Sequence, residues 1–292
     1  MARRISISQL KSRLRQQQSK QRQAVSRYNQ AVRKYNQRVR DLERAINRYN
    51  QEVRAYNSRR RHHQQRLQSE LRRLQSQHSG SSAVLRISVT RLHATYMRLE
   101  QSAAARSLSP ADNYFLDLAE REAANSVEVV NTLLAPGVSE EIVPLQQTAI
   151  TDEIAVISED LDTRWRGALF SLNRANPDAA RHFCTSSREI FAQILDIKAP
   201  DEAVFVALPK AQPTERGTAT RRSKIAFLLL QKGIQLEELA EFASEDIENI
   251  LELFDVLNVG THAQAGRYDM RALAAIKRRV EDGLVFLSRL AA

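Results

Sequence analysis

The chain has 292 residues, 42% of them hydrophobic, which is enough for one domain with its own core and an additional extended part. The single cysteine, Cys184, excludes an internal disulfide, and the longest apolar run, residues 225–230, is too short to span a bilayer, so we expect a cytoplasmic protein without membrane insertion or secretion. The net charge of +10 is divided unevenly, because residues 1–79 hold 21 Lys and Arg against four acids, whereas the remainder is acidic.

Glycine and proline are scarce, with eight and seven residues, and no long stretch alternates apolar and polar side chains. The pattern therefore predicts an all-α fold, with a long N-terminal coiled-coil helix followed by a C-terminal helical bundle. We expect a basic coiled-coil arm over residues 1–79, a helical connector over 83–160 and a compact domain over 161–292. The first break is at Ser79-Gly80-Ser81-Ser82.

The arm repeats every seven residues from Val25 to Tyr56. The two core positions are Val25, Val32, Val39, Ile46 and Val53 at a, and Tyr28, Tyr35, Leu42, Tyr49 and Tyr56 at d. This pattern is typical of a left-handed coiled coil and predicts self-association. A β-branched a position favours two strands when d is leucine, but d is mostly tyrosine here, so strand number and orientation stay open.

Basic side chains of the arm fall outside this seam. The outer b and c positions hold Arg33, Lys34, Arg40, Arg48 and Arg54. Such a stripe can lie along nucleic-acid phosphates or against the acidic body of another copy, and its affinity for nucleic acid would fall with salt. The alternative is that these charges only solvate an exposed helix.

The connector contains two expected helices, over residues 83–104 and from Ser109-Pro110 to Leu134, the second beginning with a capping serine and a proline. In the compact domain, Asn176-Pro177-Asp178 and Ala199-Pro200-Asp201 separate helices, and residues 209–218 form a polar loop.

A basic run, Arg221, Arg222 and Lys224, opens the helix after this loop. Cations at a helix start oppose the dipole, which suggests an anionic partner such as nucleic acid. Solvated charges at the edge of a loop are the alternative interpretation.

No GxxxxGK[ST], GxGxxG, HExxH or GxSxG motif occurs, and the histidines form no local metal set, so we expect no cofactor and no metal site. One acidic run nevertheless leaves a two-metal chemistry open. Its members are Glu237, Glu238, Glu241, Glu245, Asp246 and Glu248.

Residues 246–262 are expected to form one helix, because Ile247, Ile250 and Phe254 recur at helical spacing. Asn258 and His262 are four residues apart and therefore share an edge of that helix. An imidazole beside an amide is a candidate catalytic pair, and a structural histidine is the alternative.

The region from about Asp162 to Leu290 resembles the predicted pPIWI-associating nuclease domains, which are small helical domains of prokaryotic conflict systems. The resemblance is carried by Trp165-Arg166-Gly167-Ala168, Asn176-Pro177-Asp178, Ser187-Arg188-Glu189, Ala199-Pro200-Asp201 and Asn258-Val259-Gly260-Thr261-His262. The last motif also looks like the Arg-polar-x-x-x-His signature of HEPN ribonucleases, which are all-α and need no metal.

Laid on the HEPN signature, His262 takes the histidine position and Asn258 the polar position, while Leu257 stands where the signature has arginine. That arginine would balance charge on the scissile phosphate. Arg267 follows His262 closely enough to be a candidate replacement, and Arg188 or Lys224 could be supplied by the fold.

The resemblance implies a bacterial conflict or antiphage effector with a possible endonuclease domain, joined to an arm that oligomerises or binds nucleic acid. Its expected partners are a second copy of the chain, nucleic acid and other defence-system proteins. The alternative is a non-enzymatic oligomeric scaffold or nucleic-acid-binding protein with a degenerate HEPN-like domain.

Overall fold

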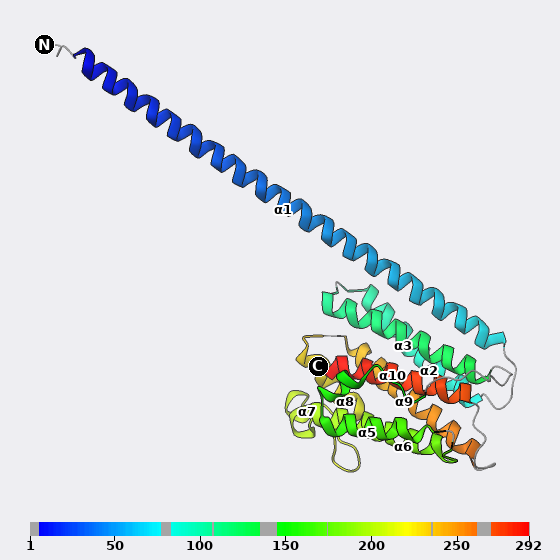
Figure 1. The fold of residues 1–292 in the computed structure, drawn as a ribbon. Coiled ribbons are helices and arrows are strands. Elements are labelled where there is room, and N and C mark those ends of the chain that lie inside the picture. The colour runs from blue at the N-terminus through cyan, green and yellow to red at the C-terminus, as the bar shows by residue number, and fades with distance from the viewer. Residues whose placement is uncertain are drawn as a thin grey trace. The chain divides into compact units, whose positions relative to one another are not determined.

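The computed structural model describes residues 6–76, 83–106, 108–134, 145–173, 175–234, 236–261 and 270–291, with the side chains of 255–261 and 270 excepted. These residues form ten α-helices and no β-strand, which confirms the predicted all-α class (Figure 1). The chain divides into two compact units, Met1–Arg59 and Arg60–Ala292, which we call the N-terminal unit and the helical body. The predicted three-part division stays a prediction.

The helices have the following bounds. They are α1 (Ile7–Ser76), α2 (Ala83–Ala104), α3 (Pro110–Leu134), α4 (Thr151–Ala155), α5 (Glu159–Ser171), α6 (Ala179–Lys198), α7 (Asp201–Ala207), α8 (Arg221–Gln231), α9 (Glu237–Thr261) and α10 (Met270–Ala291). The predicted start at Ser109-Pro110 is confirmed, because the Ser109 hydroxyl accepts a hydrogen bond from the backbone N–H of Asp112 at 3.1 Å.

The N-terminal unit is the first part of α1, a helix of 70 residues. It contains neither glycine nor proline, so no residue interrupts the backbone hydrogen bonds. Its heptad core positions lie on the surface of the single chain, with Val39 36% and Tyr35 68% exposed. The long N-terminal helix is therefore confirmed, while its assembly into a coiled coil stays a prediction.

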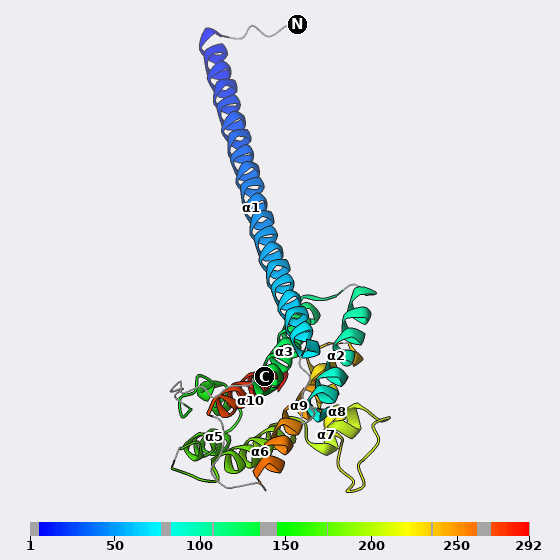
Figure 2. The same cartoon turned by 90° about the vertical axis from the view of Figure 1, so that its right-hand side faces the viewer.

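Helices α9 and α10 form the centre of the helical body (Figures 1 and 2). They pack against α2 and α3 on one side and against α6 on the other, and α5 packs outside α6. The expected apolar face of α9 is confirmed by the burial of Ile247, Ile250 and Phe254. Gly283 on α10 allows a close approach, because a side chain there would overlap the side chain of Ile250.

The last part of α1 belongs to the helical body and is held by both apolar and polar contacts. Leu67 and Leu74 are buried. Arg60 donates to both carboxylate oxygens of Glu120 on α3, at 2.7 and 3.1 Å, and the Tyr96 hydroxyl on α2 donates to the same carboxylate at 2.7 Å. This shared, fully buried carboxylate connects α1, α2 and α3.

None of the helices in the described part of the chain is long and apolar enough to cross a membrane.

Candidate functional site

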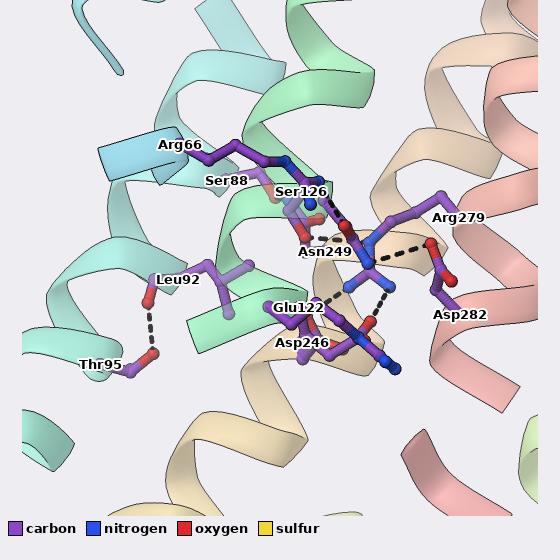
Figure 3. A network of polar contacts seen from close by, with 12 residues as sticks. Arg66, Ser88, Leu92, Thr95, Glu122, Ser126, Asp246, Asn249, Arg279 and Asp282 are labelled. Atoms are coloured by element: carbon purple, nitrogen blue, oxygen red, sulfur yellow. Dashed lines mark hydrogen bonds and ion pairs between the residues drawn. The ribbon is translucent and has the colours of Figure 1, made fainter. Parts of the chain in front are cut away.

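A buried cluster of charged side chains lies where α3, α9 and α10 meet (Figure 3). Arg279 on α10 donates from Nε to the Ser126 hydroxyl at 2.9 Å and from Nη1 to Glu122 Oε2 at 2.9 Å, both on α3. Its Nη2 donates to Asp246 Oδ1 on α9. The side chains of Arg279, Glu122 and Asp246 are completely buried. One guanidinium therefore connects the two layers of helices through charge-assisted hydrogen bonds.

This cluster shifts the titration of its carboxyl groups. Burial raises the pKa of Glu122 to about 7, although the positive charge of Arg279 opposes the shift. Burial also raises the pKa of Asp246 against the same opposing charge. Burial alone would lower the pKa of the Arg279 guanidinium, but the negative charges of Asp246 and Glu122 outweigh burial and raise that pKa. Glu122 is consequently positioned to hold a proton near neutral pH.

The cluster continues towards the surface through α3. Asn125 donates to Asp282 Oδ2 at 3.0 Å and accepts a hydrogen bond from Arg66, which also pairs with Glu128 at 2.7 Å. Asn125, Glu128 and Asp282 line an open hollow of about 370 Å³ between α3 and α10. Because Glu122, Asp246 and Arg279 themselves are fully covered, their role is to fix the helices rather than to contact a substrate.

Four of the six residues in the acidic run of α9 are engaged in ion pairs, namely Glu241, Glu245, Asp246 and Glu248. Arg91 on α2 pairs with Glu245 at 3.0 Å and also with Glu252. Arg98 pairs with Glu241, and Arg221 on α8 pairs with Glu248 at 2.6 Å. Among the residues that can be described, no group of three or more His, Cys, Asp or Glu side chains is arranged to hold a metal ion.

The predicted catalytic residues fall at the edge of the described structure. The helix predicted over residues 246–262 is observed as part of α9, which ends at Thr261. The backbone of Asn258 is thus helical, but its side chain is outside the described residues, as are His262 and Arg267. Their proximity in space stays a prediction.

The predicted nucleic-acid-binding residues are in different environments. Arg33, Lys34, Arg40, Arg48 and Arg54 are all exposed on α1. Arg222 on α8 is also exposed and lies 3.9 Å from Glu241. Lys224 is 6% exposed, and its ammonium group pairs with Asp196 at 2.5 Å and Asp201 at 2.9 Å.

The pairing of Lys224 also changes its titration. Burial alone would lower its pKa, but the hydrogen bonds with Asp196 and Asp201 outweigh that effect and raise it. The Asp201 carboxylate additionally accepts the backbone N–H of Ala219 at 3.0 Å. Lys224 therefore holds the segment after the polar loop against α6 and α7, and its charge is already matched inside the protein.

Sequence reasoning did not identify the cluster around Arg279. A signal was present, because Arg279 follows Ile276 and precedes Val280 on the apolar face of α10, and Glu122 lies among Ala119 and Ala123 on α3. A charged residue within an apolar helical face needs a buried partner.

Comparison with protein families finds a match in the C-terminal half of the chain. Residues 155–287 match the family described as a predicted pPIWI-associating nuclease. No curated protein and no solved structure matches the chain significantly. The matched segment runs from the last residue of α4 into α10 and leaves out α1, α2 and α3.

Proposed function

We propose that the segment over residues 155–287, which matches the family described as a predicted pPIWI-associating nuclease, cleaves phosphodiester bonds in RNA or DNA. The family match is the observation that carries this proposal. In this interpretation α1 is an arm that brings copies of the chain together or captures nucleic acid, and the protein is a cytoplasmic effector of bacterial conflict or antiphage defence. Other proteins of the defence system would be its partners.

In the proposed mechanism His262 is the general acid or base and Asn258 orients either its ring or the attacking hydroxyl. An unperturbed histidine has a pKa near 6.5, so both of its protonation states are available close to neutral pH. Arg267 takes the charge-balancing role, because Leu257 cannot supply it. Support comes from the HEPN-like spacing and from α9, which continues without interruption to the residue before His262.

The exposed faces of α1 support the proposed arm. Apolar a and d residues follow one another from Val25 to Tyr49, all at least 36% exposed, and burying them would favour association with another helix. The basic b and c residues are exposed as well, so they can contact nucleic-acid phosphates while the a and d residues pack against another helix.

A second candidate function is a non-enzymatic scaffold. The observation that favours it is Leu257, because the residue that would balance charge on a scissile phosphate is missing from its expected position. In that case the arm assembles the protein and the helical body only recognises nucleic acid or a partner protein.

The deciding experiment incubates purified protein with labelled RNA and DNA, with and without a chelator. We expect cleavage that survives chelation and that falls by at least about a hundredfold in His262→Ala, because a placed general acid or base contributes that much. His62→Ala, which alters an exposed histidine on α1, is the matched control and should cleave normally.

Each contrary result has a distinct meaning. Equal cleavage by a folded His262→Ala protein rejects the histidine assignment, whereas joint loss of cleavage and helical content indicates a structural histidine. Cleavage that requires divalent metal replaces the HEPN-like mechanism with a metal-dependent one. Absence of cleavage of every substrate supports the scaffold.

A further inference from the structure

Phe170, near the end of α5, has an aromatic ring that the fold leaves uncovered. Its exposed fraction is 74%, whereas most of the other phenylalanines of the chain are buried in the core. A phenylalanine gains free energy when it is removed from water, so an exposed ring on a packed domain is a candidate contact for a ligand. The ring belongs to the segment that matches the nuclease family.

The ring borders a hollow of about 510 Å³ between α5 and α6. Gly167 lies one turn before Phe170 on α5 and also lines this hollow. A Cβ atom at Gly167 would meet nothing within 4 Å, so open space extends over this part of α5. A flat group could therefore enter the hollow and lie against the ring.

The opposite wall offers polar groups at fixed positions. Asn176 donates to the Ser171 carbonyl at 2.9 Å and accepts the backbone N–H of Asp178 at 3.0 Å, which anchors its side chain. Its amide nitrogen lies 3.4 Å from Nδ1 of His182. Because an amide nitrogen only donates, a neutral His182 carries its hydrogen on Nε2. Nε2 of His182 lies 3.6 Å from Asp178 Oδ2. His182 and Ser186 are four residues apart on α6, and both line the hollow.

Two arginines near these walls are exposed to solvent. Arg166 on α5 pairs with Asp162 at 2.8 Å and Arg181 on α6 lies 4.0 Å from Asp178, and their side chains are 66% and 68% exposed. A guanidinium has five N–H donors, so each of these contacts leaves donors for a phosphate. An exposed ring, a polar wall and nearby guanidinium groups are the combination with which proteins bind unpaired nucleotides.

We propose that the hollow between α5 and α6 binds an unpaired nucleotide of single-stranded RNA or DNA, with its base stacked on Phe170 and its edge facing Asn176 and His182. This inference rests on the proposed function and specifies its substrate as single-stranded. Bases in a duplex are stacked on their neighbours, so they cannot present a face to Phe170 without leaving the helix.

The test measures binding of a single-stranded oligonucleotide and of a duplex of the same sequence to the full-length protein by fluorescence anisotropy. All variants carry a background in which α1 has lost its outer charges, so that binding by the arm does not mask the hollow. The background substitutions are Arg33→Gln, Lys34→Gln, Arg40→Gln, Arg48→Gln and Arg54→Gln. We expect Phe170→Ala to weaken single-strand binding about tenfold and Phe170→Trp to preserve it, because stacking depends on the ring.

Val206→Ala is the matched control. Val206 is 81% exposed on α7 and does not line the hollow, so its loss should leave binding unchanged. Phe170 is exposed as well, and its replacement should leave the helical content measured by circular dichroism intact.

Equal single-strand binding by Phe170→Ala and the background protein overturns the proposal, as does equal loss in single strand and duplex. Absence of single-strand binding by the background protein also overturns it. Binding that depends on Phe170 without any cleavage would support the nucleotide site and reject the nuclease function. Cleavage that depends on His262 but not on Phe170 would support the nuclease function and reject the nucleotide site.

Discussion

A buried arginine destabilises a protein unless carboxylates surround it, and Arg279 receives its two carboxylates from two other helices. Glu122 comes from α3 and Asp246 from α9, so the three charges are satisfied only when α3, α9 and α10 are correctly placed. Two carboxyl groups face one guanidinium at short range. A proton held by Glu122 relieves the excess of negative charge, consistent with its raised pKa.

This proton makes stability depend on pH. The pKa of Glu122 is raised from 4.5 to about 7 in the folded protein, so between these values the folded state binds more protons than the unfolded state. The contribution is complete below pH 4.5 and is lost as the pH rises through 7. We expect the free energy of unfolding to fall by at most about 1.4 kcal/mol per pH unit in this window, measured by urea denaturation.

Glu122→Gln resembles the protonated acid and should flatten this dependence, so that the variant becomes the more stable protein above pH 7. Glu153→Gln, at an exposed position on α4, is the control and should retain the parental slope. Identical pH dependence in the parent and in Glu122→Gln would show that Glu122 is charged in the folded state throughout.

At the scale of elements, helices outside the matched residues 155–287 pack against helices inside them. Helices α2 and α3 precede the matched residues 155–287, yet they cover one side of α9 and α10. Their contribution includes Glu122 and Ser126 for Arg279, and Ser88, whose hydroxyl accepts from Asn249 at 2.7 Å. The matched segment therefore depends on helices outside the match for part of its core.

A truncation experiment tests this dependence. A fragment of residues 155–292 should aggregate or unfold without cooperativity, because it exposes the apolar faces that α2 and α3 cover and removes one carboxylate of the Arg279 cluster. A fragment of residues 60–292 retains these helices and should unfold cooperatively in thermal circular dichroism. A monomeric, cooperatively unfolding 155–292 fragment would contradict the argument.

At the scale of the whole molecule, we expect the exposed seam of α1 to hold several copies of the chain together. Deleting residues 1–59 removes the exposed seam but retains Leu67 and Leu74, which are buried in the helical body. We expect this deletion to convert an oligomer into a monomer in light scattering, because the a and d side chains are buried only by another helix.

Substituting Val32, Val39 and Ile46 with asparagine should have the same effect as the deletion, since these residues are the a positions of three successive heptads in the seam. Substituting the outer residues Arg33, Arg40 and Arg54 with glutamine is the matched control and should leave the mass unchanged. A monomeric full-length protein would reject assembly through α1.

The local sequence determined the helices of this protein. The absence of glycine and proline, with heptads from Val25 to Tyr56, predicts the long helix α1, Ser109-Pro110 marks the start of α3, and apolar residues at helical spacing define the buried face of α9. These features could be predicted because helix formation depends on residues within a few positions of one another. The motifs after Asp162 likewise sufficed to indicate the nuclease family that residues 155–287 match.

Only the tertiary structure decided which charged side chains form ion pairs. Arg279 and Glu122 are 157 residues apart, and Lys224 and Asp196 are 28 apart, so no local pattern shows that these groups neutralise one another. The same applies to the hollow beside Phe170, whose walls come from α5, α6 and the segment between them. Sequence spacing places side chains on a face of their own helix, whereas burial and charge pairing depend on which other helix covers that face.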